Sequence, residues 1–202
     1  MHKLFVINKK EDTKRLETIN KTFKRYDLNI VEAINHEIGW KGCFLSHKKC
    51  LTMAKNLKMK YIIVIEDDCK PTDNFDNNLN EILIYLNNNT EEWDIFLGGV
   101  TNVWCYNNLI KLNTNLNLIN INKGKTAHLV IYNEKCYDFF LNHHVTIPID
   151  KCWHRKLSAL TCIPFIATQS DGNSSIEKKY VNYSKRFEGV EKNFKNIINN
   201  DT

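Results

Sequence analysis

The stretch Tyr61-Ile62-Ile63-Val64-Ile65-Glu66-Asp67-Asp68 decides the fold, because it joins a strand pattern directly to three consecutive acids. A continuous β-branched and aromatic run is typical of a strand covered on both faces, as in the middle of an α/β sheet. Open α/β sheets bind their ligands at the carboxyl ends of the strands, where these acids would lie. Three adjacent carboxylates repel one another unless a cation lies among them. The stretch therefore predicts a divalent-metal site for a phosphorylated ligand, such as a nucleotide or a sugar phosphate.

Strand and helix patterns alternate around this stretch. Strands are expected at 4–8, 28–33, 61–65 and 93–97, and helices at 11–26, 42–58 and 75–87. This alternation predicts an α/β, Rossmann-like fold whose central sheet is mostly parallel and carries helices on both faces. The second half is less regular, with strands expected at 109–112, 116–121, 127–132 and 162–168. Helices are expected there at 134–141, at 151–160 and after residue 183.

Composition limits the classes of protein that fit. The chain has 202 residues with 43% hydrophobic side chains, which suits one globular domain. A net charge of +5 favours small anionic ligands and is too weak to indicate nucleic-acid binding. Neither a signal peptide nor an apolar run of about 20 residues is recognisable, so a cytoplasmic protein with at most peripheral membrane association is expected. The seven cysteines form no CxxC pair and fit a reducing compartment.

The acidic triplet offers a pair of metal ligands. Successive side chains of an extended segment alternate between faces, so Glu66 and Asp68 would project together and Asp67 oppositely. Two carboxylates at i and i+2 can share one Mn²⁺ or Mg²⁺ and leave positions for phosphate oxygens. The alternative is a solvated acidic turn after a strand.

A second element precedes it at Gly39-Trp40-Lys41-Gly42-Cys43-Phe44-Leu45-Ser46-His47. A helix that opens with glycines and an early serine exposes backbone N–H groups suited to phosphate. His47 lies on the apolar stripe of this helix and could equally be a hydrogen-bonded core histidine. Cys43 and His47 have the i, i+4 spacing of a zinc pair, but the sequence offers no two further ligands at suitable spacing.

Together the two elements resemble glycosyltransferase family 25, the lipopolysaccharide-type and procollagen galactosyltransferases. The likeness rests on Gly42-Cys43-Phe44-Leu45-Ser46-His47 and Val64-Ile65-Glu66-Asp67-Asp68, and extends more loosely over residues 3–170. Val6-Ile7-Asn8, Trp93–Gly99, Gly124–His128 and Ile147-Pro148-Ile149-Asp150 are similar to further family segments, although His128 stands where tyrosine is usual.

The resemblance implies a single GT-A-like domain with a nucleotide-sugar-binding half at 1–100, an acceptor and catalytic half at 101–185, and a C-terminal helix at 186–202. It implies metal-dependent, inverting transfer of galactose or glucose from a UDP-sugar to a hydroxyl of a glycan or protein. Glu66 and Asp68 would be the metal ligands. The donor-binding residues implied are Asn8, Arg15, Ser46, His47 and Asp67.

Inverting transfer needs a base on the acceptor side and neutralisation of the departing diphosphate. Asp150, in the late Pro-x-Asp segment, is one candidate base, although it could instead cap the helix expected at 151–160. Asp171 is the competing base, and Lys125 could supply charge to the phosphates. His128, His154 and Gln169 are open as a third metal ligand.

Two other functions stay open. A nucleotide-sugar binder without catalysis would keep the donor site alone, whereas another divalent-metal enzyme, such as a phosphohydrolase or a nuclease, would use the acids differently. The absence of a DxDx[TV] motif and of dense basic and aromatic patches counts against the enzymes of the second group. Which sugar, which acceptor and which oligomeric state apply is not readable from the sequence.

Overall fold

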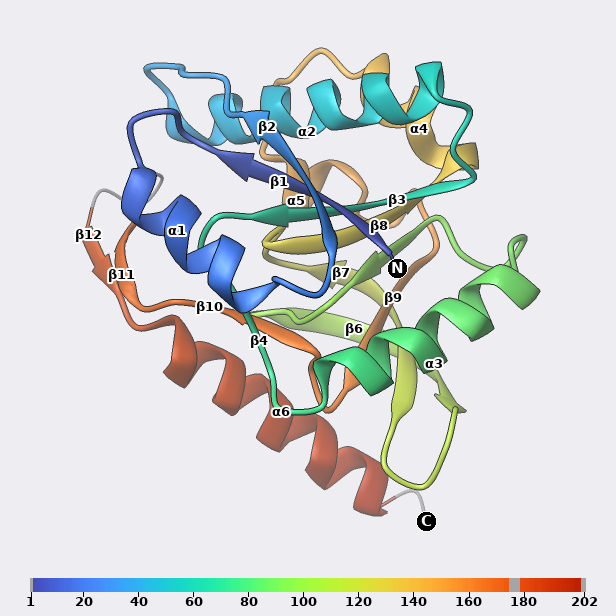
Figure 1. Cartoon of the computed structure of the whole chain (residues 1–202). Helices are drawn as coiled ribbons and strands as arrows, with labels where there is room; N and C mark the ends of the chain where they lie inside the picture. Colours follow the sequence, from blue (N-terminus) through green and yellow to red (C-terminus); the bar gives the residue numbers. More distant parts are fainter. Residues whose placement is uncertain (1, 175–178, 201–202) are drawn as a thin grey trace.

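The computed structural model describes residues 2–174 and 179–200, with some side chains in the strands and at the C-terminus left out. Its central sheet has eight strands in the order β2-β1-β3-β8-β5-β9-β7-β6 (Figure 1). The strands of this sheet are β1 (Lys3–Asn8), β2 (Asp27–Glu32), β3 (Tyr61–Glu66), β5 (Ile95–Leu97), β6 (Val103–Lys111), β7 (Asn117–Gly124), β8 (Leu129–Asn133) and β9 (Ala159–Ile163). The prediction of an α/β fold with flanking helices is confirmed.

The prediction of a mostly parallel sheet is wrong, because the sheet is mixed. Strand β1 runs parallel to β2 and β3, and β5 runs parallel to β9. Strand β8 lies antiparallel between β3 and β5, and β7 pairs antiparallel with both β6 and β9. The direction of β8 could not be read from its residues, since an apolar strand buried in the middle of a sheet looks the same in either direction.

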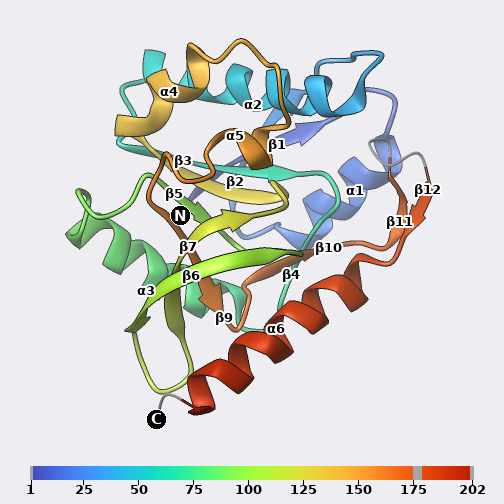
Figure 2. The same ribbon diagram turned by 180° about the vertical axis from the view of Figure 1, so that it is seen from behind.

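Helices cover both faces of the sheet, as Figures 1 and 2 show. They are α1 (Thr13–Thr22), α2 (Gly39–Asn56), α3 (Phe75–Asn88), α4 (Tyr137–Leu141), α5 (Ile149–Cys152) and α6 (Tyr183–Asn200), with a 3₁₀ turn at Glu134–Cys136. The helix expected at 151–160 is wrong: α5 ends at Cys152, and strand β9 begins at Ala159. Pro148 occupies the N-cap position of α5, so Asp150 lies inside its first turn.

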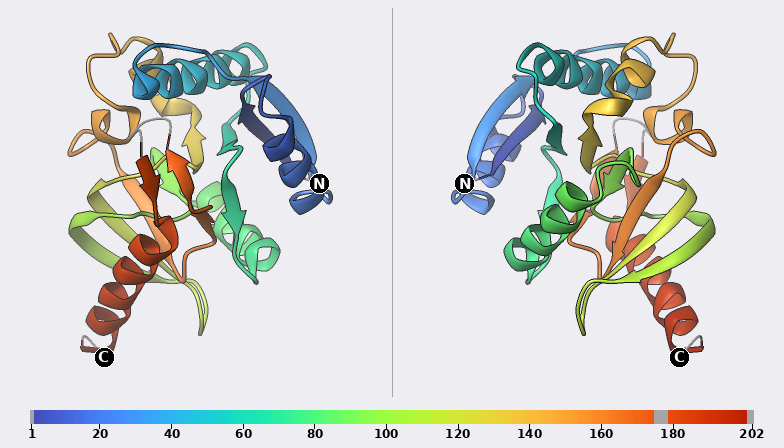
Figure 3. Two further views of the ribbon diagram at one scale, coloured as in Figure 1. Left: turned by 90° about the vertical axis from the view of Figure 1, so that its left-hand side faces the viewer. Right: turned by 90° about the vertical axis from the view of Figure 1, so that its right-hand side faces the viewer.

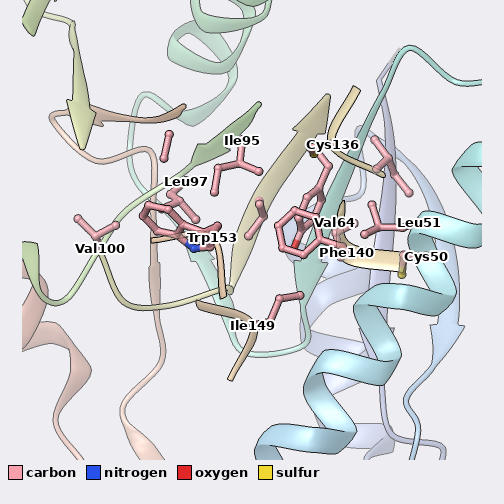
Figure 4. Close-up of a cluster of buried hydrophobic side chains, with 14 of the residues drawn as sticks. Cys50, Leu51, Val64, Ile95, Leu97, Val100, Cys136, Phe140, Ile149 and Trp153 are labelled. Atoms are coloured by element: carbon pink, nitrogen blue, oxygen red, sulfur yellow. The ribbon is translucent and has the colours of Figure 1, made fainter. Parts of the chain in front are cut away.

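Two buried clusters hold the helices to the sheet. The larger one packs α2, α4 and α5 against one face, and Figure 4 shows part of it, including Leu51, Val64, Phe140 and Trp153. The smaller one packs α1 and α3 against the other face through Ile19 and Leu79. Each element buries its apolar stripe, which is the main favourable contribution to folding.

The late chain returns to the acidic motif. Strand β10 (Ala167–Gln169) pairs with β4 (Cys69–Pro71), so that Gln169 lies opposite Cys69, directly after the acidic triplet. Strands β11 (Gly172–Ser174) and β12 (Lys179–Val181) form a second ribbon that leads into α6, and Figure 3 shows α6 running away from these ribbons. The sequence prediction of one strand at 162–168 merges β9 and β10, which belong to different sheets. Within residues 2–174 and 179–200, no helix has the length and hydropathy needed to span a membrane.

Candidate active site

The carboxyl ends of β1, β2 and β3 open onto a first cleft with a volume of about 270 Å³. The segments that follow these strands line it, together with the first turns of α1 and α2 and with the late segment from Gln169 to Ser174. This position agrees with the general rule that α/β sheets bind ligands at the carboxyl ends of their strands.

Arg15 brings a positive charge into this cleft. Its Nη1 lies 2.8 Å from Asp67 Oδ1 and 3.7 Å from Asp68 Oδ2, while its Nε lies 3.4 Å from Asp12. Burial raises the pKa of Asp67, although the ion pair with Arg15 opposes this effect. Arg15 therefore neutralises part of the acidic triplet and turns Asp67 toward α1.

Asp68 faces the late chain. Gln169 Nε2 lies 3.4 Å from both carboxylate oxygens of Asp68, and the amide of Ser170 donates to the Asp68 backbone carbonyl. Burial and the neighbouring Glu66 raise the pKa of Asp68 to about 7, and Arg15 offsets only part of this shift. The positive charge of Arg15 therefore does not fully balance the negative charges of Glu66, Asp67 and Asp68.

Glu66 faces α2 instead. Its Oε1 lies 3.1 Å from Cys43 Sγ and 3.4 Å from His47 Nε2, and Tyr132 Oη lies 2.9 Å from His47 Nδ1. Burial opposes ionisation of Glu66, but the hydrogen bonds of His47 and Cys43 outweigh it and lower the pKa of this carboxyl. His47 is fully buried below Glu66 and does not line the first cleft. The side chain of His47 therefore contacts the acidic motif, and its role in donor binding stays a prediction.

Gly42 and Ser46 position the loop at the rim of the first cleft. Ser46 Oγ accepts from the Ile34 amide at 2.8 Å and donates to the Gly42 carbonyl at 2.7 Å. A Cβ atom on Gly42 would lie 2.6 Å from the Ile34 carbonyl oxygen. The glycine and serine of this motif therefore serve to bring the chain after β2 close to α2.

Replacing Gly42 by alanine should destabilise the protein by about 1–3 kcal/mol, because the new methyl group overlaps backbone that cannot rotate away. This loss should outweigh the gain of about 1 kcal/mol that alanine brings to a helix interior. Urea unfolding would measure it. Gly189→Ala in α6 is the matched control, since no atom lies within 4 Å of its added Cβ, and it should raise stability. Equal midpoints for the two variants would contradict the close packing at Gly42.

A second cleft of about 700 Å³ adjoins the first. Both clefts are lined by Cys43, Glu66, Gln169 and Tyr183, so they meet at the acidic motif. Asp150 and Lys125 line the second cleft. The Thr126 amide lies 3.4 Å from Asp150 Oδ2, and Thr126 has a φ of 104°, an unfavourable conformation for a β-branched residue. Burial raises the pKa of Asp150, while the Thr126 amide and nearby cations oppose the shift.

The other candidates from the sequence lie elsewhere. Asp171 is exposed, accepts from the Ser184 amide at 2.8 Å in the first turn of α6, and lines neither cleft. Asn8 is buried at the end of β1, where its Nδ2 donates to the Lys9 carbonyl. His128 contacts the Ala167 carbonyl and His154 the Gly124 carbonyl, each through Nε2. Of the three side chains open as a third metal ligand, Gln169 is therefore the one next to Asp68.

The residues of the site fit a divalent cation. Asp68 and Glu66 offer the oxygen ligands that Mn²⁺ and Mg²⁺ prefer, and the Gln169 amide, which donates to Asp68 through Nε2, would offer its carbonyl oxygen after rotation of the side chain. Glu66 also belongs to a group with Cys43 and His47 whose ligand atoms lie within 4.8 Å of one another. The sequence argument that Glu66 and Asp68 alternate along an extended segment does not apply, since β3 ends at Glu66 and the next two residues form a turn.

The pKa of Asp68 gives a testable pH dependence of stability in the metal-free protein. Relative to Asp68→Asn, the wild type should lose stability as pH rises from about 4, the usual value in an unfolded chain, to about 7. The reason is that the raised pKa favours the folded state only while its carboxyl is protonated. Thermal unfolding in chelator at several pH values would measure the difference. Parallel pH profiles for the two proteins would contradict the raised pKa.

The structure thus combines a mixed α/β sheet with two adjoining clefts that meet at one acidic centre. The chain belongs to glycosyltransferase family 25: a sequence model of that family, described as an LPS biosynthesis protein, matches residues 38–147, more than half of the chain. The matched region contains α2, the acidic triplet and β8. No curated protein sequence matches the chain.

One solved structure supports the fold. The crystal structure of A197 from STIV aligns with a TM-score of 0.52 at 12% identity, over 90% of this chain and 93% of that one. HddC from Yersinia pseudotuberculosis aligns at 8% identity over 80% of this chain and 69% of that chain, with a TM-score of 0.44 that is too low to support an argument. At such identities the likeness to A197 concerns the fold alone.

Proposed function

We propose that this family 25 glycosyltransferase has a GT-A fold and transfers a hexose, galactose or glucose, from a UDP-sugar to a hydroxyl of a glycan or protein acceptor. Transfer inverts the anomeric carbon and depends on Mn²⁺ or Mg²⁺. The observation that carries the proposal is the meeting of two clefts at Glu66 and Gln169. A transferase needs separate sites for donor and acceptor that join at the reacting carbon.

The first cleft is the proposed donor site. Arg15 and Lys9 supply positive charge at its wall, and the first turn of α2 contributes backbone N–H groups and the positive end of the helix dipole. Asp67, held by Arg15, is positioned to accept hydrogen bonds from a ribose or sugar hydroxyl. Ser46 contributes to donor binding indirectly: it accepts a hydrogen bond from the Ile34 amide and so holds in place the loop that forms one wall of this cleft.

Asp68, Glu66 and Gln169 are the proposed ligands of the cation. A bound divalent cation would neutralise the diphosphate leaving group as a Lewis acid. Arg15 lies 3.7 Å from Asp68 and offsets only part of the repulsion from Glu66, which agrees with the raised pKa of Asp68. Lys125, in the second cleft, adds positive charge near the junction.

The second cleft is the proposed acceptor site, and Asp150 is its proposed base. An inverting displacement needs a carboxylate that removes the acceptor proton as the new bond forms. Asp150 lines this cleft, and its raised pKa improves it as a proton acceptor. Trp40 and Tyr183 in the lining offer aromatic faces on which a sugar ring can pack. Asp171, which lines neither cleft, loses support as the base.

A panel of UDP- and GDP-sugars tests the proposal, with binding and release of the nucleoside diphosphate both recorded, with and without Mn²⁺. Metal-dependent release of UDP that accelerates with an acceptor supports hexosyl transfer. Binding without release, even with acceptors present, would instead indicate a nucleotide-sugar binder. Cleavage of phosphate esters with no nucleotide-sugar binding would overturn the proposal in favour of a phosphohydrolase.

A further inference from the structure

Cys43, His47 and Glu66 bring three different metal-binding atoms together at the junction of the clefts. Cys43 and His47 are one turn apart on α2 and therefore lie on the same face of that helix. Glu66 comes from the end of β3 and lies against this face, with its Oε1 3.1 Å from the sulfur and 3.4 Å from His47 Nε2. The sequence alone offered only the pair on the helix, and the fold adds the third ligand.

The ligand atoms all lie within 4.8 Å of one another, and the nitrogen-to-oxygen spacing matches a tetrahedral cation site. With bonds of about 2.3 Å to sulfur and 2.0–2.2 Å to nitrogen and oxygen, ligand atoms stand about 3.4 Å (N to O) and about 3.6 Å (S to O) apart. The observed nitrogen-to-oxygen distance already has this value. The sulfur-to-oxygen distance of 3.1 Å is shorter than this value, so the Cys43 sulfur and the Glu66 carboxylate would have to move apart when a cation binds.

The surroundings also suit a metal. Metal-bound histidines usually engage their other ring nitrogen in a hydrogen bond, and His47 Nδ1 lies 2.9 Å from the buried hydroxyl of Tyr132. With a cation bound, Nδ1–H would donate to the Tyr132 hydroxyl and Nε2 would give up its hydrogen bond to Glu66 and bind the cation through its lone pair. Cys43 and Glu66 line both clefts, so a fourth ligand position can be reached by water or substrate. Three protein ligands with one open position are typical of accessible zinc sites.

We propose that Cys43, His47 and Glu66 form a site for a thiophilic divalent cation of the Zn²⁺ class, which shares Glu66 with the proposed oxygen-ligated site at Asp68 but adds a sulfur and an imidazole ligand. Binding forms bonds from the cation to the Cys43 sulfur, His47 Nε2 and Glu66, and the thiol proton passes to solvent. Sulfur and imidazole ligands favour Zn²⁺ and Co²⁺ over Mn²⁺ and Mg²⁺. Because Glu66 is shared, occupancy of this site should inhibit the transferase, a consequence that rests on the proposed function.

Titration of the full, reduced chain with Co²⁺ alone tests the site without any sugar donor. The expected result is an intense thiolate-to-cobalt absorption in the near ultraviolet, with visible bands of four-coordinate Co²⁺, both removed by added Zn²⁺ but not by Mg²⁺. Cys43→Ser should abolish the thiolate band. Cys50→Ala, which removes a buried thiol from the same helix outside both clefts, should retain it.

Absence of a thiolate band at saturating Co²⁺, or a band that survives in Cys43→Ser, would overturn the site. A second measurement covers the case in which Cys43→Ser does not fold. Zn²⁺ should slow alkylation of Cys43 in the wild type at least ten-fold, followed by peptide mass spectrometry, and unchanged alkylation would also refute the proposal. Since neither readout involves turnover, failure of hexosyl transfer would leave both results interpretable.

Discussion

Asp68→Asn is expected to lower metal-dependent turnover of a UDP-sugar by about three orders of magnitude. A Lewis-acid cation stabilises the departing diphosphate by several kcal/mol, and each 1.36 kcal/mol corresponds to about a factor of ten in rate. The amide keeps the size of the side chain and can still interact with Gln169, but it loses the charge that binds the cation. UDP release at saturating donor and a range of Mn²⁺ concentrations would measure the effect.

Two neighbouring acids provide controls for this loss. Asp67→Asn breaks the 2.8 Å ion pair with Arg15 in the same cleft and should chiefly raise the donor KM, by about ten-fold if the pair is worth about 1.4 kcal/mol. Asp73→Asn changes an exposed acid that lines neither cleft and should leave turnover unchanged. Wild-type activity in Asp68→Asn, with the fold intact by circular dichroism, would show that the catalytic cation binds elsewhere.

The first half of the fold was predictable because its signals are local. The apolar stripe of α2 and the β-branched run of β3 fix element type within a few residues, and the structure places both where the sequence pattern does. The prediction of secondary structure fails where short segments are stabilised by strands far away in the sequence. Residues 159–163 were assigned partly to a helix because Asp150 resembles a cap, but they form β9, which pairs with β5 and β7. Long-range pairing of this kind leaves no periodic signal in the chain.

The residues of the candidate site also fall into two groups: those that a local sequence pattern predicts and those that only the folded chain brings together. The acidic triplet and the glycine-serine motif are each a short local pattern: strand-end position predicted the cleft at the triplet, and the family resemblance predicted that the glycine-serine helix lies beside it. Gln169 contacts Asp68 across 101 positions, and Tyr132 reaches His47 across 85, so their roles required the folded chain. For Tyr132 the sequence contains one signal, a polar hydroxyl in an otherwise apolar strand, because a buried hydroxyl group usually forms a hydrogen bond.

Asp150→Asn is expected to lower acceptor-dependent transfer by about 10²–10⁴-fold, the usual contribution of a general base. Binding of the UDP-sugar should be unchanged, since Asp150 lies in the second cleft and the proposed donor site is the first. The wild-type rate should rise with pH as Asp150 ionises, and this rise should disappear in the variant because an amide takes up no proton at neutral pH.

Asp171→Asn is the matched control: the Asp171 carboxylate accepts from the Ser184 amide at the start of α6, so the substitution should lower stability somewhat but change the transfer rate little. The reverse pattern, with transfer lost in Asp171→Asn and kept in Asp150→Asn, would move the base out of the second cleft and would remove the main support for assigning that cleft to the acceptor.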